Sequence, residues 1–397
     1  MKAKRVFLIV LDSVGAGEMP DAADFGDSGA HTLRSVWQTG KLDIPNLQSL
    51  GIGNIDGLDF LKKSDSPLAS VARMCERSQG KDTTVGHWEI AGHVSSAPLP
   101  TFPNGFPEEV LQKVRRISGR ELLCNKTYSG TAVINDYGKE AKEKNAVIIY
   151  TSADSVLQLA VQVNGVMELE ELYRICEELR AELTGEEQGI GRIIARPYVE
   201  LSDGSYKRTA DRRDYSLAPP KVLLPEAVKQ AGYDSISVGK ISDIFAGVGF
   251  TESVRTHSNA EGMELTEKFI STDFSGLCFT NLVDFDTNWG HRRDADGYAR
   301  GLSEFDAWLG RILPKLCDGD ALIITADHGC DPKYLKTTDH TREYTPLMVY
   351  GKNIAPINFG TRQSFSDIAA TVAELLGIEL KTEGRALELR PLSRGVL

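Results

Sequence analysis

Cysteine, long apolar runs and an excess of positive charge are all scarce in this chain of 397 residues. The six cysteines are scattered and form no Cys-x-x-Cys pair, so nothing indicates a zinc ribbon or a disulfide-built scaffold. No apolar run approaches the roughly 20 residues that a membrane-spanning helix needs. The net charge of -11 argues against nucleic acid or an anionic membrane as the main partner. We therefore expect a cytoplasmic, monomeric protein that acts on small molecules.

The amino-terminal segment MKAKRVFLIVLD superficially resembles a signal peptide. Its apolar run, residues 6–11, ends at Asp12. That is shorter than the roughly 7–15 residues of a signal core, so we interpret it as a buried strand. Similar short runs recur at residues 6–12, 146–154, 235–240, 277–286, 321–329 and 346–351. Because helix-like stretches such as residues 364–378 separate several of them, we predict an α/β fold with a mostly parallel sheet flanked by helices.

The middle of the chain has a different character. A proline-rich stretch at residues 97–109 begins it, and another at residues 215–222 ends it. We predict an inserted α+β domain over residues 98–218, with residues 1–97 and 219–397 forming the core. A helix is expected at residues 167–183, where apolar residues at helical spacing are explained by core packing.

Acidic residues and histidines follow three of the predicted strands. They are Asp12, Asp284, Asp286, His291, Asp327, His328 and His340. A single aspartate after a strand is most often a turn or cap residue. Parallel strands, however, bring their carboxyl ends to one edge of a sheet, so these residues are expected to converge. Carboxylates mixed with imidazoles favour two divalent ions of the Mn²⁺ or Zn²⁺ kind over ions that prefer oxygen ligands alone.

Two adjacent threonines, Thr83 and Thr84, lie in the stretch GKDTTVGHWE at residues 80–89. Such a pair is a turn, a helix cap or a nucleophile. A hydroxyl bound to a metal ion loses its proton far more readily than a free one, so a two-metal site would make a threonine a competent nucleophile. If a helix begins here, its first N–H groups would be able to hold an incoming phosphate.

Eight motifs together closely resemble the prokaryotic type of phosphopentomutase, a family within the alkaline phosphatase superfamily. They are VLDSVGAGEMPDA, GKDTTVGHWE, YTSADSVLQ, IARPY, GKISD, NLVDFD followed by GHRRD, TADHG and DHTREYTPL. The resemblance implies an alkaline phosphatase-like core and an isomerase of nucleoside catabolism that interconverts ribose 1-phosphate and ribose 5-phosphate, and likewise the 2-deoxyribose phosphates. It also implies a phosphothreonine enzyme, a 1,5-bisphosphate intermediate and two Mn²⁺ ions. The implied activator is a sugar bisphosphate, either ribose 1,5-bisphosphate or glucose 1,6-bisphosphate.

Carried over position by position, the resemblance assigns a role to each candidate residue. One ion would be held by Asp12, Asp327 and His328, with Thr83 reaching the same centre. The other ion would be held by Asp286, His291 and His340, which leaves Asp284 as a supporting or structural residue. Thr83 becomes the nucleophile because it directly follows the Lys-Asp pair. The implied substrate contacts are Ser152, Asp154, Arg192, Ile194 and Arg208 in the inserted domain and Lys240 in the core.

The charge pattern of the inserted domain agrees with these contacts. Between Arg192 and Lys221 there are seven basic residues and four acidic ones, a local balance that suits the binding of a second phosphate. A metal-dependent phosphatase or phosphodiesterase would share the metal chemistry, and so would a phosphoglycerate mutase, whose nucleophile is usually serine. A non-catalytic sugar-phosphate binder would not need the complete ligand set. The threonine and the motifs of the inserted domain favour the pentose mutase.

Overall fold

The computed structural model describes residues 2–152, 155–184, 189–337 and 339–392. The chain divides into two compact units. The first, which we call the core domain, contains residues 1–96 and 219–397, and the second, the cap domain, contains residues 97–218. The first boundary falls one residue before the expected one. Among the described residues, no helix combines the length and the apolar character needed to cross a membrane.

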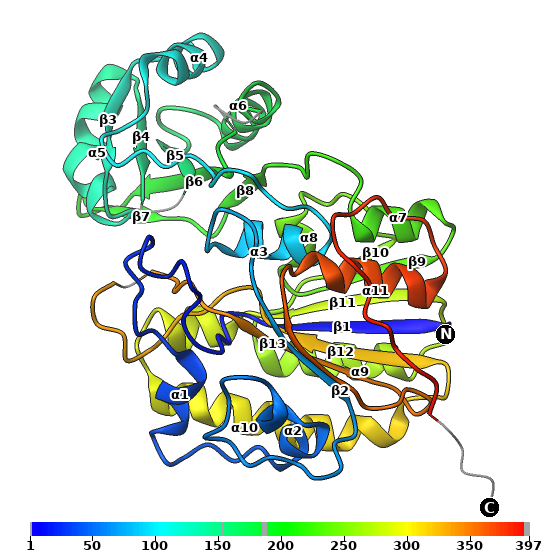
Figure 1. Cartoon of the computed structure of the whole chain (residues 1–397). Helices are drawn as coiled ribbons and strands as arrows, with labels where there is room; N and C mark the ends of the chain where they lie inside the picture. Colours follow the sequence, from blue (N-terminus) through cyan, green and yellow to red (C-terminus); the bar gives the residue numbers. More distant parts are fainter. Residues whose placement is uncertain (1, 153–154, 185–188, 338, 393–397) are drawn as a thin grey trace, which may run out of the picture. The chain divides into compact units, whose positions relative to one another are not determined.

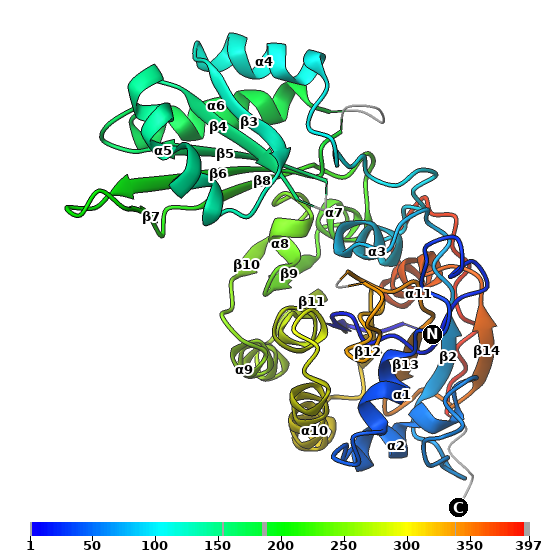
Figure 2. The ribbon, with the colours of Figure 1, turned by 90° about the vertical axis from the view of Figure 1, so that its left-hand side faces the viewer.

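The core domain is built on an eight-stranded sheet. In spatial order its strands are β10 (Glu252–Val254), β9 (Asp234–Val238), β11 (Gly276–Leu282), β1 (Arg5–Leu11), β12 (Asp320–Thr325), β13 (Thr345–Tyr350), β2 (Ser70–Met74) and β14 (Asn358–Arg362). Strand β1 lies between β11 and β12 (Figure 1), and β2 and β14 lie side by side at one edge (Figure 2). Only β13 runs antiparallel to its neighbours, so the prediction of a mostly parallel sheet is confirmed for the described residues.

Helices cover both faces of this sheet, which explains why β1, β11 and β12 are apolar and buried along their whole length. One face carries α1 (Thr32–Trp37), α2 (Pro45–Leu50), α9 (Asn259–Ile270) and α10 (Ala295–Ile312). The other carries α3 (Thr83–Ile90), α7 (Leu224–Gln230), α8 (Ile241–Ile244) and α11 (Ser366–Leu376) (Figure 1). Short helical turns are η1 (Ile52–Asn54), the π-helical turn η2 (Phe285–Gly290) and η3 (Leu313–Lys315).

Helix α11 lies within the stretch predicted from its apolar periodicity, and its start shows how the sequence sets a helix boundary. Its N-cap residue is Phe365, which offers no capping side chain. The Ser364 hydroxyl accepts a hydrogen bond from the Ser366 N–H at 3.1 Å instead. A serine one residue before the cap position therefore satisfies a free N–H group at the start of the helix.

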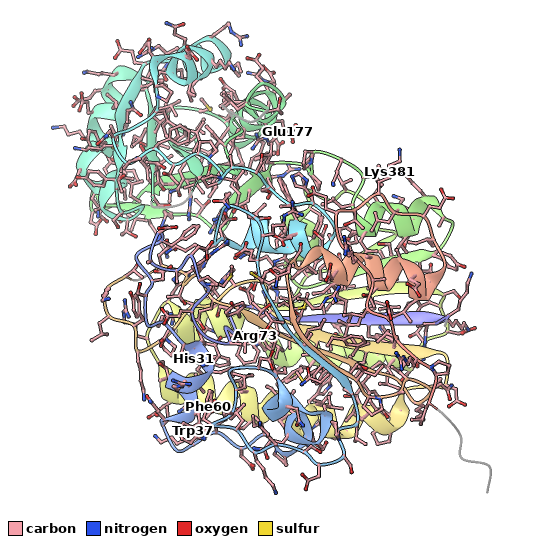
Figure 3. The ribbon with its side chains drawn as sticks, viewed as in Figure 1. His31, Trp37, Phe60, Arg73, Glu177 and Lys381 are labelled. Carbon is pink, nitrogen blue, oxygen red and sulfur yellow. The ribbon has the colours of Figure 1, made fainter. Side chains whose placement is uncertain are left out.

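An aromatic cluster supports α1 in the core domain. The rings of His31 and Trp37 each lie 5.3 Å from the ring of Phe60 (Figure 3). The Arg34 guanidinium lies 5.2 Å from the same ring. His31 also accepts a hydrogen bond from the Arg34 N–H and so caps the helix. The cluster thereby ties α1 to the segment that contains Phe60.

The cap domain has its own six-stranded sheet. Its strands are β3 (Leu122–Thr127), β4 (Val147–Thr151), β5 (Val156–Gln162), β6 (Arg192–Glu200) and β7 (Tyr206–Arg208), with β8 (Arg213–Ser216) also pairing with β6. Helices α4 (Glu108–Ser118) and α6 (Leu169–Glu182) pack on one face, and α5 (Ala132–Lys144) packs on the other. Parallel and antiparallel pairs both occur. The apolar run predicted at residues 146–154 therefore contributes β4 to this sheet and not to the core sheet.

Candidate active site

The register of the core sheet brings the predicted residues to one edge. Strand β1 is parallel to both β11 and β12, with Leu11 opposite Leu282 and Val10 opposite Thr325. The residues that follow these strands, including Asp12, Asp286 and Asp327, therefore emerge at the same end of the sheet. This is the edge at which ligands bind in open α/β sheets.

One group of candidate ligands surrounds the His328 ring. Its Nε2 lies 3.5 Å from Asp12 Oδ1, 3.2 Å from Asp327 Oδ2 and 3.2 Å from the Thr83 hydroxyl oxygen. All four side chains are buried. Burial lowers the pKa of His328 to about 4, so its ring is neutral and able to act as a ligand at neutral pH.

A second group contains Asp286, His291 and His340. The two imidazole Nε2 atoms lie 3.1 Å apart, and they lie 3.4 Å and 3.3 Å from the Asp286 carboxylate. The π-helical turn η2 explains how Asp286 and His291 meet, because the His291 N–H donates to the Asp286 carbonyl oxygen at 2.9 Å. That i to i+5 bond places both side chains on one side of the turn, and such turns are frequent at functional sites.

Backbone carbonyls orient two of the imidazoles. His340 Nδ1 lies 2.9 Å from the Lys81 carbonyl oxygen, and His328 Nδ1 lies 3.1 Å from the Gly329 carbonyl oxygen. A carbonyl accepts, so each Nδ1 carries the proton and each Nε2 presents its lone pair to the cluster. Metal-binding histidines are held in this way.

Three buried carboxylate oxygens in the cluster have no hydrogen-bond partner among the described residues. They are Asp12 Oδ1, Asp286 Oδ1 and Asp327 Oδ2. Buried polar atoms are nearly always satisfied, so these atoms fit a bound cation. Burial, reinforced by the charges of Asp327 and Asp286, raises the pKa of Asp12 well above its usual range. A divalent ion would relieve this repulsion, and the mixed oxygen and nitrogen donors suit a borderline ion.

The ligand atoms form two groups whose members lie within 4.8 Å of one another. The first group, Asp286, His291 and His340, coincides with the set expected for one ion. The second group, Asp12, Asp286 and His328, contains Asp286 where Asp327 was expected. Asp327 remains beside His328, at the 3.2 Å given above. Asp286 therefore lies within reach of both groups.

Asp284 belongs to neither ligand group. Its carboxylate accepts hydrogen bonds from the Asn259 N–H at 2.7 Å and from the Asn288 amide at 2.9 Å. Its own N–H donates to the Asn259 side chain at 2.9 Å. Asp284 thus joins the end of β11 to the start of α9, which supports the structural role expected for it.

Helix α3 presents Thr83 to the cluster. It begins at Thr83 with Asp82 as the N-cap, and Asp82 Oδ1 accepts hydrogen bonds from the N–H groups of Thr84 and Val85 at 2.9 and 3.1 Å. Neither threonine is therefore the cap. The Asp82 side chain thus already holds two of the first N–H groups that were expected to be open to a phosphate, those of Thr84 and Val85.

A close approach of backbones fixes α3 against the end of β12. A Cβ atom at Gly86 would lie 2.3 Å from the Asp327 carbonyl oxygen, far inside van der Waals contact. Glycine at this position lets the helix that carries Thr83 lie directly on the strand end that carries Asp327.

Sequence reasoning missed three residues that hold the ligands from behind. The Ser13 N–H donates to Asp327 Oδ1 at 3.0 Å, with Ser13 itself at a φ of 70°. The Asn281 amide donates to Asp12 Oδ2 at 2.9 Å. His87 lies beside both Thr83 and Asp327. The available signals were Asn281 in a fully buried strand and the i to i+4 spacing of Thr83 and His87.

Lys240 lies at the cap position of α8, just after β9. Its positive charge acts on Asp12 and opposes the effect of burial on the pKa of that carboxyl. The expected core-domain contact is therefore near the metal cluster.

Two of the expected cap residues lie on β6. Arg192 and Ile194 lie two residues apart in this strand, so their side chains are on the same face of the sheet. The Arg192 guanidinium is 3.8 Å from the Asp214 carboxylate. Ser152 directly follows β4. Asp154 lies outside the described residues.

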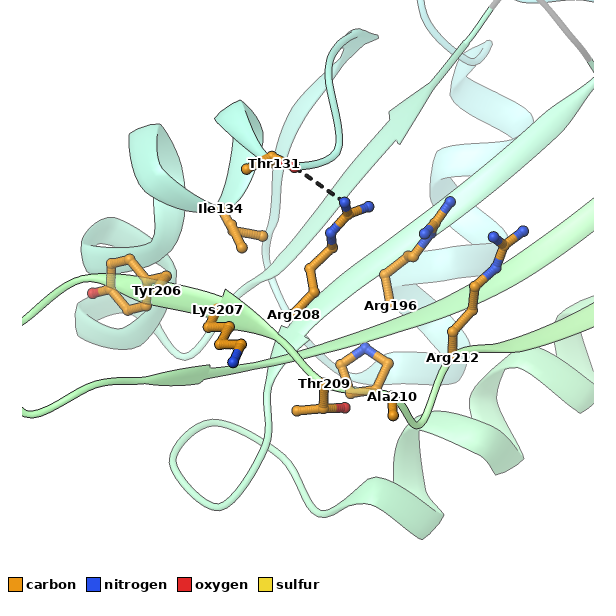
Figure 4. Close-up of a pocket in the computed structure, with 10 residues that line it drawn as sticks. Thr131, Ile134, Arg196, Tyr206, Lys207, Arg208, Thr209, Ala210 and Arg212 are labelled. Atoms are coloured by element: carbon orange, nitrogen blue, oxygen red, sulfur yellow. Dashed lines mark hydrogen bonds between the residues drawn. The ribbon is translucent and has the colours of Figure 1, made fainter. Parts of the chain in front are cut away.

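A basic pocket of about 810 Å³ opens on the cap domain (Figure 4). The side chains of Arg196, Arg208 and Arg212 extend side by side in it, and Arg208 donates a hydrogen bond to the Thr131 hydroxyl at 3.1 Å. Burial and the neighbouring Arg212 lower the pKa of Arg196. Arg208 thus lines a basic surface and pairs with Tyr198 of β6. Arg192 lies six residues earlier along β6, opposite Ser216.

Comparison with known proteins places the chain in a family. Residues 4–380 match the family model of the Metalloenzyme superfamily. The chain is 53% identical over 385 residues to a phosphopentomutase of Lachnoclostridium phytofermentans, covering 96% of this chain and 98% of that protein. The chain belongs to the phosphopentomutase family. It is therefore an isomerase of the phosphotransferase kind, and the predicted family is confirmed.

Further relatives agree. A phosphopentomutase of Acetivibrio thermocellus is 50% identical over 386 residues, covering 96% of this chain and 98% of that protein. Among solved structures, the PH0037 protein from Pyrococcus horikoshii has a TM-score of 0.50 at 12% identity, covering 97% of this chain and all of that chain. A Leishmania mexicana phosphoglycerate mutase has a TM-score of 0.50 at 11% identity, with coverages of 99% and 98%. These two structures share the fold alone.

Proposed function

We propose that this enzyme interconverts ribose 1-phosphate and ribose 5-phosphate, and likewise the 2-deoxyribose phosphates, with Thr83 as the phosphoryl carrier. The observation that carries the proposal is the Thr83 hydroxyl oxygen, which lies 3.2 Å from His328 Nε2 at the buried ligand cluster. The phosphopentomutase family supplies the class of reaction. A hydroxyl at a metal centre is a far better nucleophile than an ordinary threonine.

The resident cofactors in this proposal are two Mn²⁺ ions. One is held by Asp12, Asp327 and His328 with Thr83, and the other by Asp286, His291 and His340. The unpartnered carboxylate oxygens and the neutral imidazoles support this assignment. When bound, such ions neutralise the charge that develops on a transferring phosphoryl group.

In the proposed cycle, phosphorylated Thr83 gives its phosphoryl group to the free hydroxyl of a pentose monophosphate. The bond from the Thr83 oxygen to phosphorus breaks, a bond from the sugar oxygen to phosphorus forms, and the proton that the sugar hydroxyl loses ends on the Thr83 oxygen, which is again a hydroxyl. The resulting 1,5-bisphosphate returns its other phosphate to Thr83 and leaves as the isomer. Ribose 1,5-bisphosphate or glucose 1,6-bisphosphate acts as the activator by phosphorylating Thr83 at the start.

The cap domain is proposed to bind the sugar and the phosphate that is not transferred. The residues are Ser152, Asp154, Arg192, Ile194 and Arg208, together with Lys240 of the core domain. Arg208 has the most direct support, because it lines a pocket with two further arginines that can form charge-assisted hydrogen bonds to phosphate. The expectation of a cytoplasmic monomer stays a prediction.

One experiment tests the reaction. The enzyme is incubated with ribose 1-phosphate, Mn²⁺ and a trace of glucose 1,6-bisphosphate, and the products are followed by ³¹P NMR. Ribose 5-phosphate is the expected product. Free phosphate would indicate a phosphatase, and an unchanged spectrum would indicate a binding protein. A parallel sample with 3-phosphoglycerate tests the phosphoglycerate mutase alternative, for which we expect no conversion.

A further inference from the structure

His87 is completely buried beside the proposed nucleophile, yet it belongs to neither ligand group. It lies one helical turn after Thr83 on α3, and its Nδ1 is 2.8 Å from the Thr83 carbonyl oxygen. The same nitrogen is 3.1 Å from Asp327 Oδ2. On the other side of the ring, Nε2 is 3.3 Å from the Asn281 amide nitrogen. One ring thus touches three separate elements of the core domain.

The hydrogen bonds determine how this ring is protonated. The Asn281 amide nitrogen only donates, and it also donates to Asp12 Oδ2 at 2.9 Å, which fixes the orientation of the amide. His87 Nε2 must therefore accept. The proton is then on Nδ1, where the Thr83 carbonyl oxygen accepts it and the Asp327 carboxylate lies beside it.

His87 and Asn281 together form a continuous chain behind the ligands. It runs from the Asp12 carboxylate through Asn281 and His87 to the Thr83 backbone and Asp327. These contacts leave Asp12 Oδ1 without a hydrogen-bond partner among the described residues. The chain therefore holds the Asp12 and Asp327 carboxylates and the Thr83 backbone, and it leaves Asp12 Oδ1 available to a cation.

We propose that His87 and Asn281 are a positioning pair that sets the affinity and geometry of one of the two metal ions. This inference rests on the proposed function, because it takes Asp12, Asp327 and Thr83 to be ligands of a single ion. Neither residue of the pair touches Asp286, His291 or His340 by any hydrogen bond found in the described residues. Replacing either residue should therefore lower the affinity for one ion and leave the affinity for the other unchanged. Groups that orient metal ligands typically contribute about 10- to 100-fold in affinity.

The test is a Mn²⁺ titration of the metal-free full-length protein, followed by the electron paramagnetic resonance signal of free Mn²⁺ and by calorimetry. The variants are His87→Phe, which keeps the packing against the Phe279 ring, and Asn281→Leu, which keeps the volume. The matched control is Asn259→Leu, another buried asparagine that bonds Asp284 and no proposed ligand. Denaturant unfolding of each metal-free variant reports the loss of stability separately.

Two ions should bind the wild-type protein and the Asn259→Leu control. In His87→Phe and Asn281→Leu one binding event should weaken about 10- to 100-fold while the other keeps its affinity. The double variant should bind no worse than the weaker single variant, because both changes break one chain. His87→Asn, which keeps a donor near the Nδ1 position, should recover part of the loss.

Other outcomes would overturn the inference. Unchanged binding of both ions, or equal weakening of both, would make His87 and Asn281 ordinary packing residues while the two-ion assignment survives. A variant too unstable to titrate is replaced by His87→Asn, for which an affinity loss at one ion supports the inference and an unaltered isotherm contradicts it. Fewer than two ions in the wild-type protein would contradict both this inference and the proposed metal centre.

Discussion

The candidate ligand cluster of the core domain and the basic pocket of the cap domain hold their charged side chains in opposite ways. In the core, the candidate ligands are almost all buried, and Ser13, Asn281 and backbone carbonyls fix them from behind. In the cap, Arg208 and Arg212 are exposed, and Arg208 is held by one hydrogen bond to Thr131. The candidate ligands of the core domain are thus held in one fixed geometry. The cap offers long, adaptable cations that suit recognition of a phosphate.

The largest expected effect is a loss of activity caused by a change in the core domain. Thr83→Ala should abolish turnover, because the hydroxyl beside His328 is the proposed nucleophile. Thr84→Ala is the matched control: it removes the same group from the adjacent, half-buried residue and should retain at least part of the activity. The mutase rate with ribose 1-phosphate measures both. An active Thr83→Ala enzyme would remove Thr83 from the mechanism.

Removing the metals should have nearly as large an effect. Chelation leaves several buried carboxylates facing one another, so activity should vanish and the thermal midpoint should fall. Mn²⁺ should restore activity better than Mg²⁺, because imidazole nitrogens suit a borderline ion. Differential scanning calorimetry and the mutase assay, before and after each ion is added, provide the readout. Full activity in chelator, or equal rescue by Ca²⁺, would contradict a two-metal centre.

A smaller effect tests the cap side. Arg208→Ala should slow mutase turnover about 10- to 100-fold, equivalent to roughly 1.5–3 kcal/mol for one lost charge-assisted hydrogen bond. Hydrolysis of a small aryl phosphate should change much less, since that ester has no second phosphate. Arg213→Ala is the control, because its guanidinium lies over the rings of Tyr173 and Tyr215. Equal losses on both substrates would place Arg208 outside phosphate recognition.

The smallest expected effect is on stability and concerns a buried acid near the core cluster. Burial raises the pKa of Glu343 to about 7, although hydrogen bonds from Thr341 and Thr32 oppose the change. Between the pKa of Glu343 in the unfolded chain and about 7, the folded protein keeps this carboxyl protonated while the unfolded chain ionises it. The free energy of unfolding is therefore higher at low pH and falls as the pH rises through this window.

Denaturant unfolding of the metal-free protein between pH 5 and 8 measures this contribution. The wild-type free energy of unfolding should fall more over this range than that of Glu343→Gln, which carries no titrating group there. The exposed Glu388→Gln variant should keep the wild-type slope. Parallel slopes for the wild-type and Glu343→Gln proteins would mean that Glu343 stays ionised throughout.

Much of the core domain was predictable because buried parallel strands appear in the sequence as short, continuous apolar runs. Continuous apolar runs ending in Asp12, Asp286 and Asp327 identified both the strands and the edge at which they meet. The antiparallel direction of β13 was not predictable, since an apolar run reads the same in either direction. The Asp82 cap was missed for a related reason: three polar residues in a row compete for one cap position, and only backbone geometry decides between them.

The supporting residues were harder to find than the ligands. His87 and Asn281 act through contacts between α3, β1 and β11, which no spacing within a single segment reveals. The π-helical turn that joins Asp286 to His291 also has no simple sequence pattern. In the cap, the local excess of basic residues was visible in the sequence. Their gathering into one pocket depends on the pairing of β6 with β7 and β8.

The central claim is that the core cluster uses Thr83 as its phosphoryl carrier, and one measurement tests it directly. The Mn²⁺-loaded enzyme is treated with glucose 1,6-bisphosphate, quenched and digested, and the peptide containing residues 80–89 is mapped by fragmentation mass spectrometry. The account predicts one phosphate on Thr83 and none in the Thr83→Ala variant. Phosphate on Thr84, or a turning-over enzyme that never carries phosphate on this peptide, would contradict it.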